Sequence, residues 1–185
     1  MENGSENYRR YREAGDMQAF AALITEYRDG LIGYLGSITG DLSLAEELAE
    51  DTFVRLGVKR PRDKGTGSFK TWLYTIGRNV TIDALRRRAR HPELPLSEEE
   101  SAAATETIEE IFCRDERKRQ LHRAMQKLKT GDRQLLWLYY FEGFSLREAA
   151  DVLHKSTHAA ETQMVRARAA LKAQLLKEGF VNEEL

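Results

Sequence analysis

Residues 137–171, WLYYFEGFSLREAADVLHKSTHAAETQMVRARAAL, constrain the fold of this chain more than any other stretch. Ser145 stands three residues before Glu148, which is the spacing of a capping box at the start of a helix. The HKST turn that follows ends in a serine and a threonine, and either can cap the next helix. That helix carries Arg166 and Arg168. Two helices joined by a tight turn, the second longer and basic, are typical of a helix-turn-helix that binds DNA.

The rest of the chain also has helical periodicity. Period-two alternation is scarce, there are only 3 prolines, and Ala, Leu, Glu and Arg are frequent, so the sequence predicts an all-α fold. Apolar residues recur at three- and four-residue steps over residues 17–35, 43–56 and 69–90, which predicts three amphipathic helices. Asp16 is the expected N-cap of the first, and the GSITGD segment, residues 36–41, is expected to end it.

The C-terminal part of the chain is predicted to form a separate helical unit. Residues 91–110 hold two prolines and many Ser, Ala, Thr and Glu, which is the composition of a linker. A helix is expected over residues 108–129, and Asp132 is the expected N-cap of another over 133–141. We therefore predict two small helical domains joined by a flexible acidic linker, the second domain containing the helix-turn-helix, with bounds 1–92, 93–110 and 111–185.

Composition indicates a soluble, cytoplasmic protein. Cys113 is the single cysteine, so the chain cannot form an internal disulfide. No apolar run reaches the roughly 20 residues that span a bilayer, and the polar start lacks the apolar core of a signal peptide. We therefore expect no membrane contact of the chain's own.

The formal net charge of -1 conceals a strong segregation of charge along the chain. Residues 55–90 carry 11 Lys/Arg against 2 Asp/Glu, a net +9, whereas residues 91–116 carry 1 against 9, a net -8. Residues 43–56 carry an acidic row that is either a solvated helix face or a docking surface for a basic partner. The alternation suggests basic surfaces that face nucleic acid, separated by acidic surfaces that meet something else.

The basic stretch contains a loop and a helix with different features. Residues 57–68 have loop composition, and their GTGS does not fit the phosphate-loop pattern, so a loop that touches nucleic acid is favoured over a nucleotide site. Four arginines crowd the end of the helix predicted over residues 69–90, more than its dipole alone would explain. We interpret Trp72 as part of the apolar stripe rather than as a base-stacking residue.

Other chemistry receives little support. His154 and His158 lie four residues apart and with Cys113 could suggest a metal, but they straddle a turn and no further ligand has zinc-site spacing. No triad, carboxylate pair or nucleophile–base spacing is present. We expect no catalytic residue, no metal and no cofactor.

Four segments in fixed order resemble one protein family. They read AEELAEDTFVRL, FKTWLYTIGRNVTIDALRRR, LHRAMQKLKTGDRQLLWLYYFEGFSLREAADVL and VRARAAL. Together they are similar to a bacterial RNA polymerase sigma factor of the extracytoplasmic-function (ECF, group IV) class. The resemblance covers about residues 17–90 and 117–176.

The resemblance implies a transcription-initiation factor that binds core RNA polymerase and directs it to promoters. The acidic helix would dock on the β′ clamp helices of the polymerase, a second contact would be made with the β flap, and an anti-sigma factor would hold the protein inactive. The implied polymerase-docking residues are Asp41, Glu46, Glu47, Glu50 and Asp51.

The resemblance also implies two DNA-binding faces. The residues implied for the minus-ten promoter element, including a loop pocket for a flipped base over residues 64–68, are Arg55, Lys59, Arg60, Lys64, Ser68, Lys70, Arg78, Asn79, Asp83, Arg86 and Arg87. Those implied for the minus-thirty-five element in the major groove are Ser156, Thr157, His158, Glu161, Thr162, Gln163, Arg166 and Arg168.

The recognition helix departs from the family at two positions. The family commonly has a Gly-Thr-Val-Lys-Ser-Arg-like run where this chain has HAAETQ, so a Lys is replaced by Glu161 and an Arg by Gln163. We expect weaker or differently specified binding there, in which Glu161 could accept from cytosine N4 and Gln163 could read adenine.

Two alternatives stay open at this point. A helix-turn-helix regulator that acts without core polymerase would need an effector or dimer interface in place of the basic loop and arginine-rich helix. A sigma-like adaptor would bind polymerase with weakened promoter contact.

Overall fold

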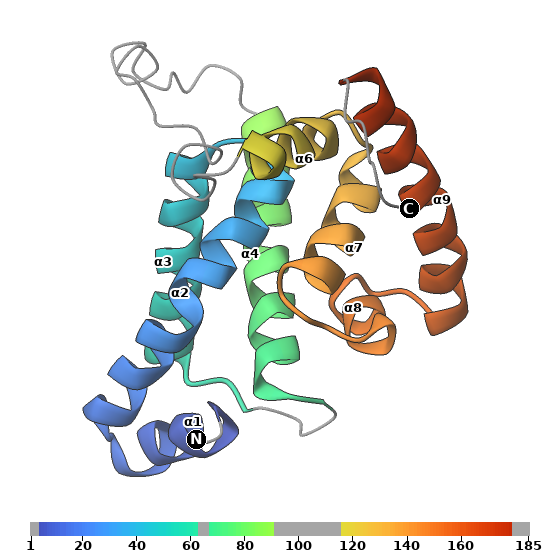
Figure 1. Ribbon diagram of the computed structural model, residues 1–185. Coiled ribbons are helices and arrows are strands. Elements are labelled where there is room, and N and C mark those ends of the chain that lie inside the picture. Colours follow the sequence, from blue (N-terminus) through green and yellow to red (C-terminus); the bar gives the residue numbers. More distant parts are fainter. Residues whose placement is uncertain (1–3, 63–66, 91–115, 179–185) are drawn as a thin grey trace, which may run out of the picture.

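The computed structural model describes residues 4–62, 67–90 and 116–178, and the side chains of residues 116–119 lie outside this description. Within these ranges the chain forms eight helices and no strand, so the predicted all-α class is confirmed. Helices α1–α4 make one unit and α6–α9 another, and Figure 1 shows them packed side by side. The predicted linker over 93–110, the helix start near 108 and Lys64 fall outside the described residues.

Helix α2, Met17–Thr39, is the central helix of the first unit and is longer than predicted. Asp16 caps it as expected, because its carboxylate accepts from the backbone N–H groups of Gln18 (3.1 Å) and Ala19 (3.0 Å). The predicted break at residues 36–41 is wrong at its start. Ile38 continues the buried face, and the helix ends only at Gly40, whose φ of 72° suits glycine.

Helix α1, Gly4–Ala14, has no counterpart in the sequence prediction. Its buried face consists of Gly4, Asn7, Tyr8 and Tyr11, two of them polar or small, so the segment has little apolar periodicity of its own. It forms because the two tyrosine rings pack against α2, α3 and the start of α4. Such stabilisation comes from tertiary contacts and not from local propensity.

Helices α3, Leu42–Lys59, and α4, Phe69–Arg90, lie beside α2 and complete the first unit. The side chain of Asp41 caps α3 by accepting from the backbone N–H of Leu44 at 3.1 Å. Helix α3 runs three residues beyond the predicted end at 56 and stops at Arg60, which has a φ of 42°. Helix α4 has the predicted bounds.

The second unit contains α6, Glu116–Gln126, α7, Thr130–Tyr140, α8, Leu146–Val152, and α9, Thr157–Lys177. The capping box of Ser145 and Glu148 is present as predicted, and Ser156 caps α9 by accepting from the N–H of Ala159. Asp132 is not an N-cap, which corrects the prediction. Helix α7 begins earlier, and the Asp132 carboxylate is buried against α9, where it accepts hydrogen bonds.

The two units share an interface of α2 and α4 with α7 and α8. Trp137 packs so closely on Gly33 that a Cβ there would lie 2.9 Å from the indole ring. The buried Arg133 donates to the carbonyl of Ser37 in α2 and, at 2.9 Å, to that of Gln126 at the end of α6. The core therefore runs without interruption from one unit to the other.

Candidate nucleic-acid interface

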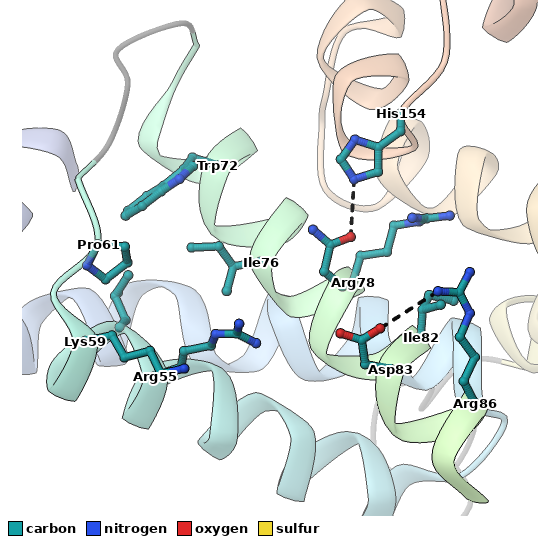
Figure 2. A pocket seen from close by; sticks show the side chains of 12 residues that line it. Arg55, Lys59, Pro61, Trp72, Ile76, Arg78, Ile82, Asp83, Arg86 and His154 are labelled. Carbon is teal, nitrogen blue, oxygen red and sulfur yellow. Dashed lines mark hydrogen bonds and ion pairs between the residues drawn. The ribbon is translucent and has the colours of Figure 1, made fainter. Parts of the chain in front are cut away.

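A cavity of about 660 Å³ lies between α3 and α4, and His154, from the turn before α9, borders it on one side (Figure 2). We call it the α3–α4 groove. It brings together six of the residues that the sequence suggested for the minus-ten element: Arg55, Lys59, Arg78, Asn79, Asp83 and Arg86. Its other lining residues are Leu56, Pro61, Trp72, Ile76, Ile82 and His154.

The helical spacing of α4 assembles the long wall of the groove. Residues 72, 76, 79, 83 and 86 follow one another at three- and four-residue steps, so they lie along one face of the helix. Four cations line the groove against the single carboxylate of Asp83, which lies 3.9 Å from Arg86. A surplus of positive charge in a concave site attracts the phosphate backbone of a nucleic acid.

Trp72 gives the groove an aromatic surface. Its ring packs on Tyr8 and Phe69, with centroid distances of 5.2 and 5.8 Å, yet it remains partly exposed and borders the cavity. It therefore packs against the core as part of the apolar stripe, as expected, and also presents part of its ring to the cavity. Cations combined with an accessible aromatic ring suit a single-stranded nucleic acid, whose bases stack while its phosphates are neutralised.

The remaining residues suggested for the minus-ten element lie outside the groove lining. The Arg60 guanidinium sits over the Tyr11 ring at 4.7 Å, and Lys70 contacts the second unit. Ser68 precedes α4 and accepts from the backbone N–H of Thr71 at 3.1 Å. Arg87 is exposed near the end of α4, and Lys64 is not described.

Three residues of the second unit contact this face, and sequence reasoning missed all of them. Gln134 accepts from Arg78 Nε at 3.1 Å, and His154 Nε2 lies 3.2 Å from Asn79 Oδ1. The carbonyl of Glu142 accepts from Lys70 Nζ at 2.6 Å. Each pair is separated by more than 50 residues along the chain, so local pattern could not reveal it.

The Glu142 side chain is enclosed between the two units. Its carboxylate accepts from the Tyr74 hydroxyl at 2.5 Å and lies 3.3 Å from Lys70 Nζ. Burial, together with the neighbouring Glu142 charge, raises the pKa of Tyr74 well above its usual value. The carboxylate reaches this position because Gly30 has no side chain, since a Cβ there would lie 2.8 Å from Glu142 Oε2.

His154 adopts a backbone conformation that side chains rarely take, with a φ of 54°. Glycine or asparagine usually occupies such a position. The strained turn aims the imidazole at the α3–α4 groove, as Figure 2 shows. Backbone strain of this kind is typical of positions with a functional constraint.

The exposed arc of α9 contains most of the residues suggested for the minus-thirty-five element. His158, Glu161, Thr162 and Arg166 are exposed, and Val165, which the sequence reading did not include, lies among them. Ser156 and Thr157 stand at the start of the helix. Arg168 lies over the rings of Tyr139 and Tyr140, 5.6 Å from each centroid.

Gln163 does not belong to this exposed face, which corrects the suggestion that it reads adenine. Its side chain is buried, and its amide donates to Asp132 Oδ1 at 2.9 Å and accepts from Lys155. The same carboxylate oxygen accepts from Arg166 at 3.1 Å. Gln163 therefore acts inside the helix-turn-helix, where it donates to Asp132, and Asp132 in turn holds Arg166 at the edge of the arc.

The acidic row of α3 is a solvent-exposed face. Glu46, Glu47, Glu50 and Asp51 are all exposed, and Arg88, 4.0 Å from Glu47, is the one cation that pairs with them among the described residues. Asp41 differs from the others because its carboxylate is engaged as the cap of α3.

Two negative findings concern only the described residues. No group of three His, Cys, Asp or Glu is arranged to hold a metal ion, and Cys113 is not among them. None of the helices combines the length and the hydrophobicity needed to span a bilayer.

Comparison with known proteins matches both units. Residues 23–91 match the family described as Sigma-70 region 2, and residues 118–171 match Sigma-70, region 4. The chain is 31% identical over 157 residues to RNA polymerase sigma factor YlaC of Bacillus subtilis, covering 84% of this chain and 91% of the relative. It is 28% identical over 174 residues to ECF RNA polymerase sigma factor SigW of the same organism, covering 87% and 91%.

Two solved structures have a similar fold. CnrH, in complex with the cytosolic domain of CnrY, superimposes with a TM-score of 0.67 at 26% identity, over 94% of this chain and 97% of that one. The sigma factor RpoE, in complex with the anti-sigma factor NepR from Bartonella quintana, gives a TM-score of 0.65 at 21% identity, over 85% and 96%.

Proposed function

Because this chain belongs to the ECF sigma factors of bacterial RNA polymerase and directs promoter-specific initiation, we propose a role for each of its three surfaces. The acidic face of α3 binds core polymerase, the α3–α4 groove holds the minus-ten element, and the exposed arc of α9 reads the minus-thirty-five element. The observation that carries this assignment is the assembly of six suggested residues from two helices in one basic groove.

The acidic face of α3 supports a protein partner rather than DNA. Its carboxylates would repel phosphates, and Glu46, Glu50 and Asp51 form no ion pair with any described residue. A basic surface of the polymerase, such as that proposed for the β′ clamp helices, would supply the missing positive charge. Asp41 contributes by capping the helix, and the second unit would meet the β flap.

The groove supports capture of a single strand. Arg55, Lys59 and Arg78 offer charge to phosphates, while Trp72 offers a ring on which an unpaired base can stack. We propose that the outlying residues Arg60, Ser68, Lys70 and Arg87, and Lys64 in the part that is not described, extend the contact along the strand.

The arc of α9 supports major-groove binding by an unusual set of side chains. Arg166 is held by Asp132, and Thr162 and Val165 lie beside it. A threonine or valine methyl can contact thymine, and Glu161 can accept from cytosine N4. The helix start would contact the sugar-phosphate backbone of the DNA through Ser156, Thr157 and His158. Arg168 would extend the contact at the other end of the arc.

The chain itself supplies binding and positioning, and the phosphoryl transfer belongs to the polymerase. We propose that it acts in the cytoplasm, where core polymerase is found, and that an anti-sigma factor covers its polymerase and DNA surfaces. The sigma factor RpoE, which has a similar fold, is in complex with an anti-sigma factor in its solved structure. We propose domain bounds of 1–92 and 111–185, which place α1–α4 in one domain and α6–α9 in the other.

Run-off transcription with purified core polymerase on the DNA upstream of this protein's own gene tests the assignment. Glu46→Lys with Glu50→Lys should abolish core binding, whereas Arg78→Ala should retain it and lose initiation. Operator binding without core would support the helix-turn-helix regulator instead. Core binding by the wild type without initiation would support the adaptor.

A further inference from the structure

Two tyrosines of α1 hold the end of α3. The Tyr11 hydroxyl donates to the carbonyl of Gly57 at 2.9 Å, and the Tyr8 hydroxyl donates to that of Pro61 at 2.7 Å. Both side chains are almost fully buried, at 5% and 3% exposure. They therefore bracket Arg60, the residue at which α3 stops.

Arg60 needs such support because of its backbone. Its φ of 42° lies in the left-handed region, which costs a non-glycine residue free energy unless neighbouring contacts hold it. The Arg60 guanidinium lies over the Tyr11 ring. The Tyr11 ring also stacks on Phe20, with ring centroids 4.3 Å apart. The chain direction after α3 is thus set by contacts with α1.

Tyr8 also reaches the start of α4. Its ring lies 5.6 Å from Phe69 and 5.2 Å from Trp72, centroid to centroid. One side chain therefore joins Pro61 and Trp72, which stand on opposite sides of the segment between the two helices. Both residues line the α3–α4 groove, and Figure 2 shows them facing each other near one end of it.

We propose that Tyr8 and Tyr11 are positioning residues for the minus-ten element, because their contacts fix the Pro61–Trp72 end of the groove, where an aromatic ring is accessible to an unpaired base. They lie outside the segment that matches Sigma-70 region 2 and do not line the groove themselves. The inference rests on the proposed role of the groove and adds α1 to the parts that determine promoter choice.

The test compares holoenzymes made with wild-type chain, Tyr8→Phe, Tyr11→Phe and the double variant. Phenylalanine keeps the buried rings and removes only the hydroxyls, so the fold is retained. Tyr27→Phe is the matched control, because its ring packs on the same Phe69, at 5.5 Å, while its hydroxyl pairs with Glu26. The probes are the promoter mapped by run-off transcription and copies with single-base substitutions scanned through its minus-ten element.

The measured quantity is the ratio of initiation on the mapped promoter to initiation on each substituted copy. This ratio is independent of how much active protein is present, so a general loss of stability cannot change it. Each hydrogen bond contributes a factor of about five to the stability of this end of the groove. Each single variant should therefore lose about fivefold in discrimination and the double variant up to about 25-fold, with core affinity unchanged.

Unchanged discrimination in the double variant would overturn the inference while leaving the proposed function intact. An equal loss in Tyr27→Phe would overturn it too, because the effect would then belong to the aromatic cluster in general. A wild-type holoenzyme that initiates equally on every copy would refute the proposed role of the groove, and the inference with it.

Discussion

Replacing Glu142 should weaken the packing between the two helical units. Its carboxylate accepts from the Tyr74 hydroxyl at 2.5 Å and lies 3.3 Å from Lys70 Nζ, and its side chain is only 11% exposed. Hydrogen bonds to a charged group contribute about 1.5–3 kcal/mol. The Lys70 side chain is 32% exposed, so solvent screening reduces its ion pair to less than about 1 kcal/mol.

The two contacts together give an expected loss of about 2–3 kcal/mol for Glu142→Ala. Since about 1.4 kcal/mol corresponds to a factor of ten, the equilibrium between packed and separated units should shift by roughly 30- to 140-fold. Glu142→Gln keeps an acceptor for Tyr74 and should lose only about 1 kcal/mol. The order wild type, Gln, Ala is itself part of the expectation.

Energy transfer between dyes on Glu46→Cys in α3 and Lys172→Cys in α9, in a Cys113→Ser background, measures the separation. Both positions are exposed. Glu161→Ala is the matched control, because it removes an exposed carboxylate of the same unit that has no partner across the interface. Transfer in Glu142→Ala equal to that in the control would refute the reasoning.

Three further changes test other features. His122 is buried and its ring nitrogens have no hydrogen-bond partner. Burial and, to a lesser extent, the charge of Arg133 lower the pKa of His122. The free energy of unfolding should therefore be highest above about pH 6.5 and should fall below that pH, where the unfolded state takes up a proton that the folded state does not. Urea unfolding at pH 7.5 and 5.5 should show that His122→Phe loses this dependence, and an unchanged acid limb would exclude His122 as its source. His154→Gly should stabilise the second unit by about 1 kcal/mol through relief of the left-handed backbone, while weakening contact with Asn79; a lower melting temperature and tighter packing of the units would contradict both parts. Glu161→Lys should steepen the salt dependence of binding to minus-thirty-five DNA by about one unit in a gel-shift titration, and an unchanged slope would show that the side chain meets no phosphate.

The helix caps that involve only residues close together in the chain could be predicted from the sequence. The cap at Asp16 and the capping box of Ser145 with Glu148 are satisfied within four residues, so their pattern is visible in the sequence. Asp132 misled the same reasoning. Its carboxylate accepts hydrogen bonds from Gln163 and Arg166 instead of capping α7, and these two residues reach it only after α9 has folded against α7.

The candidate site was predictable along α4 and not across the molecule. Arg78, Asn79 and Asp83 share a helix, so their spacing places them on adjoining faces of one element. His154 and Glu142 come to that face through packing of the second unit against α4, and the position of the Glu142 carboxylate also depends on the absence of a side chain at Gly30. The local sequence around a helical glycine does not show whether a distant carboxylate packs against it.

Arg133 joins the two units chemically, so expressing one domain without the other changes the bonding of this side chain. Its guanidinium satisfies a carbonyl at the end of α6 and one in α2 at the same time. Residues 111–185 expressed alone would lack the carbonyl of Ser37, so one donor of this guanidinium would lose both its acceptor and the helix that buries it. In the isolated fragment, water or other side chains would have to replace the lost contact of that arginine. The melting temperature of the fragment would therefore not equal the stability of the same residues in the intact protein.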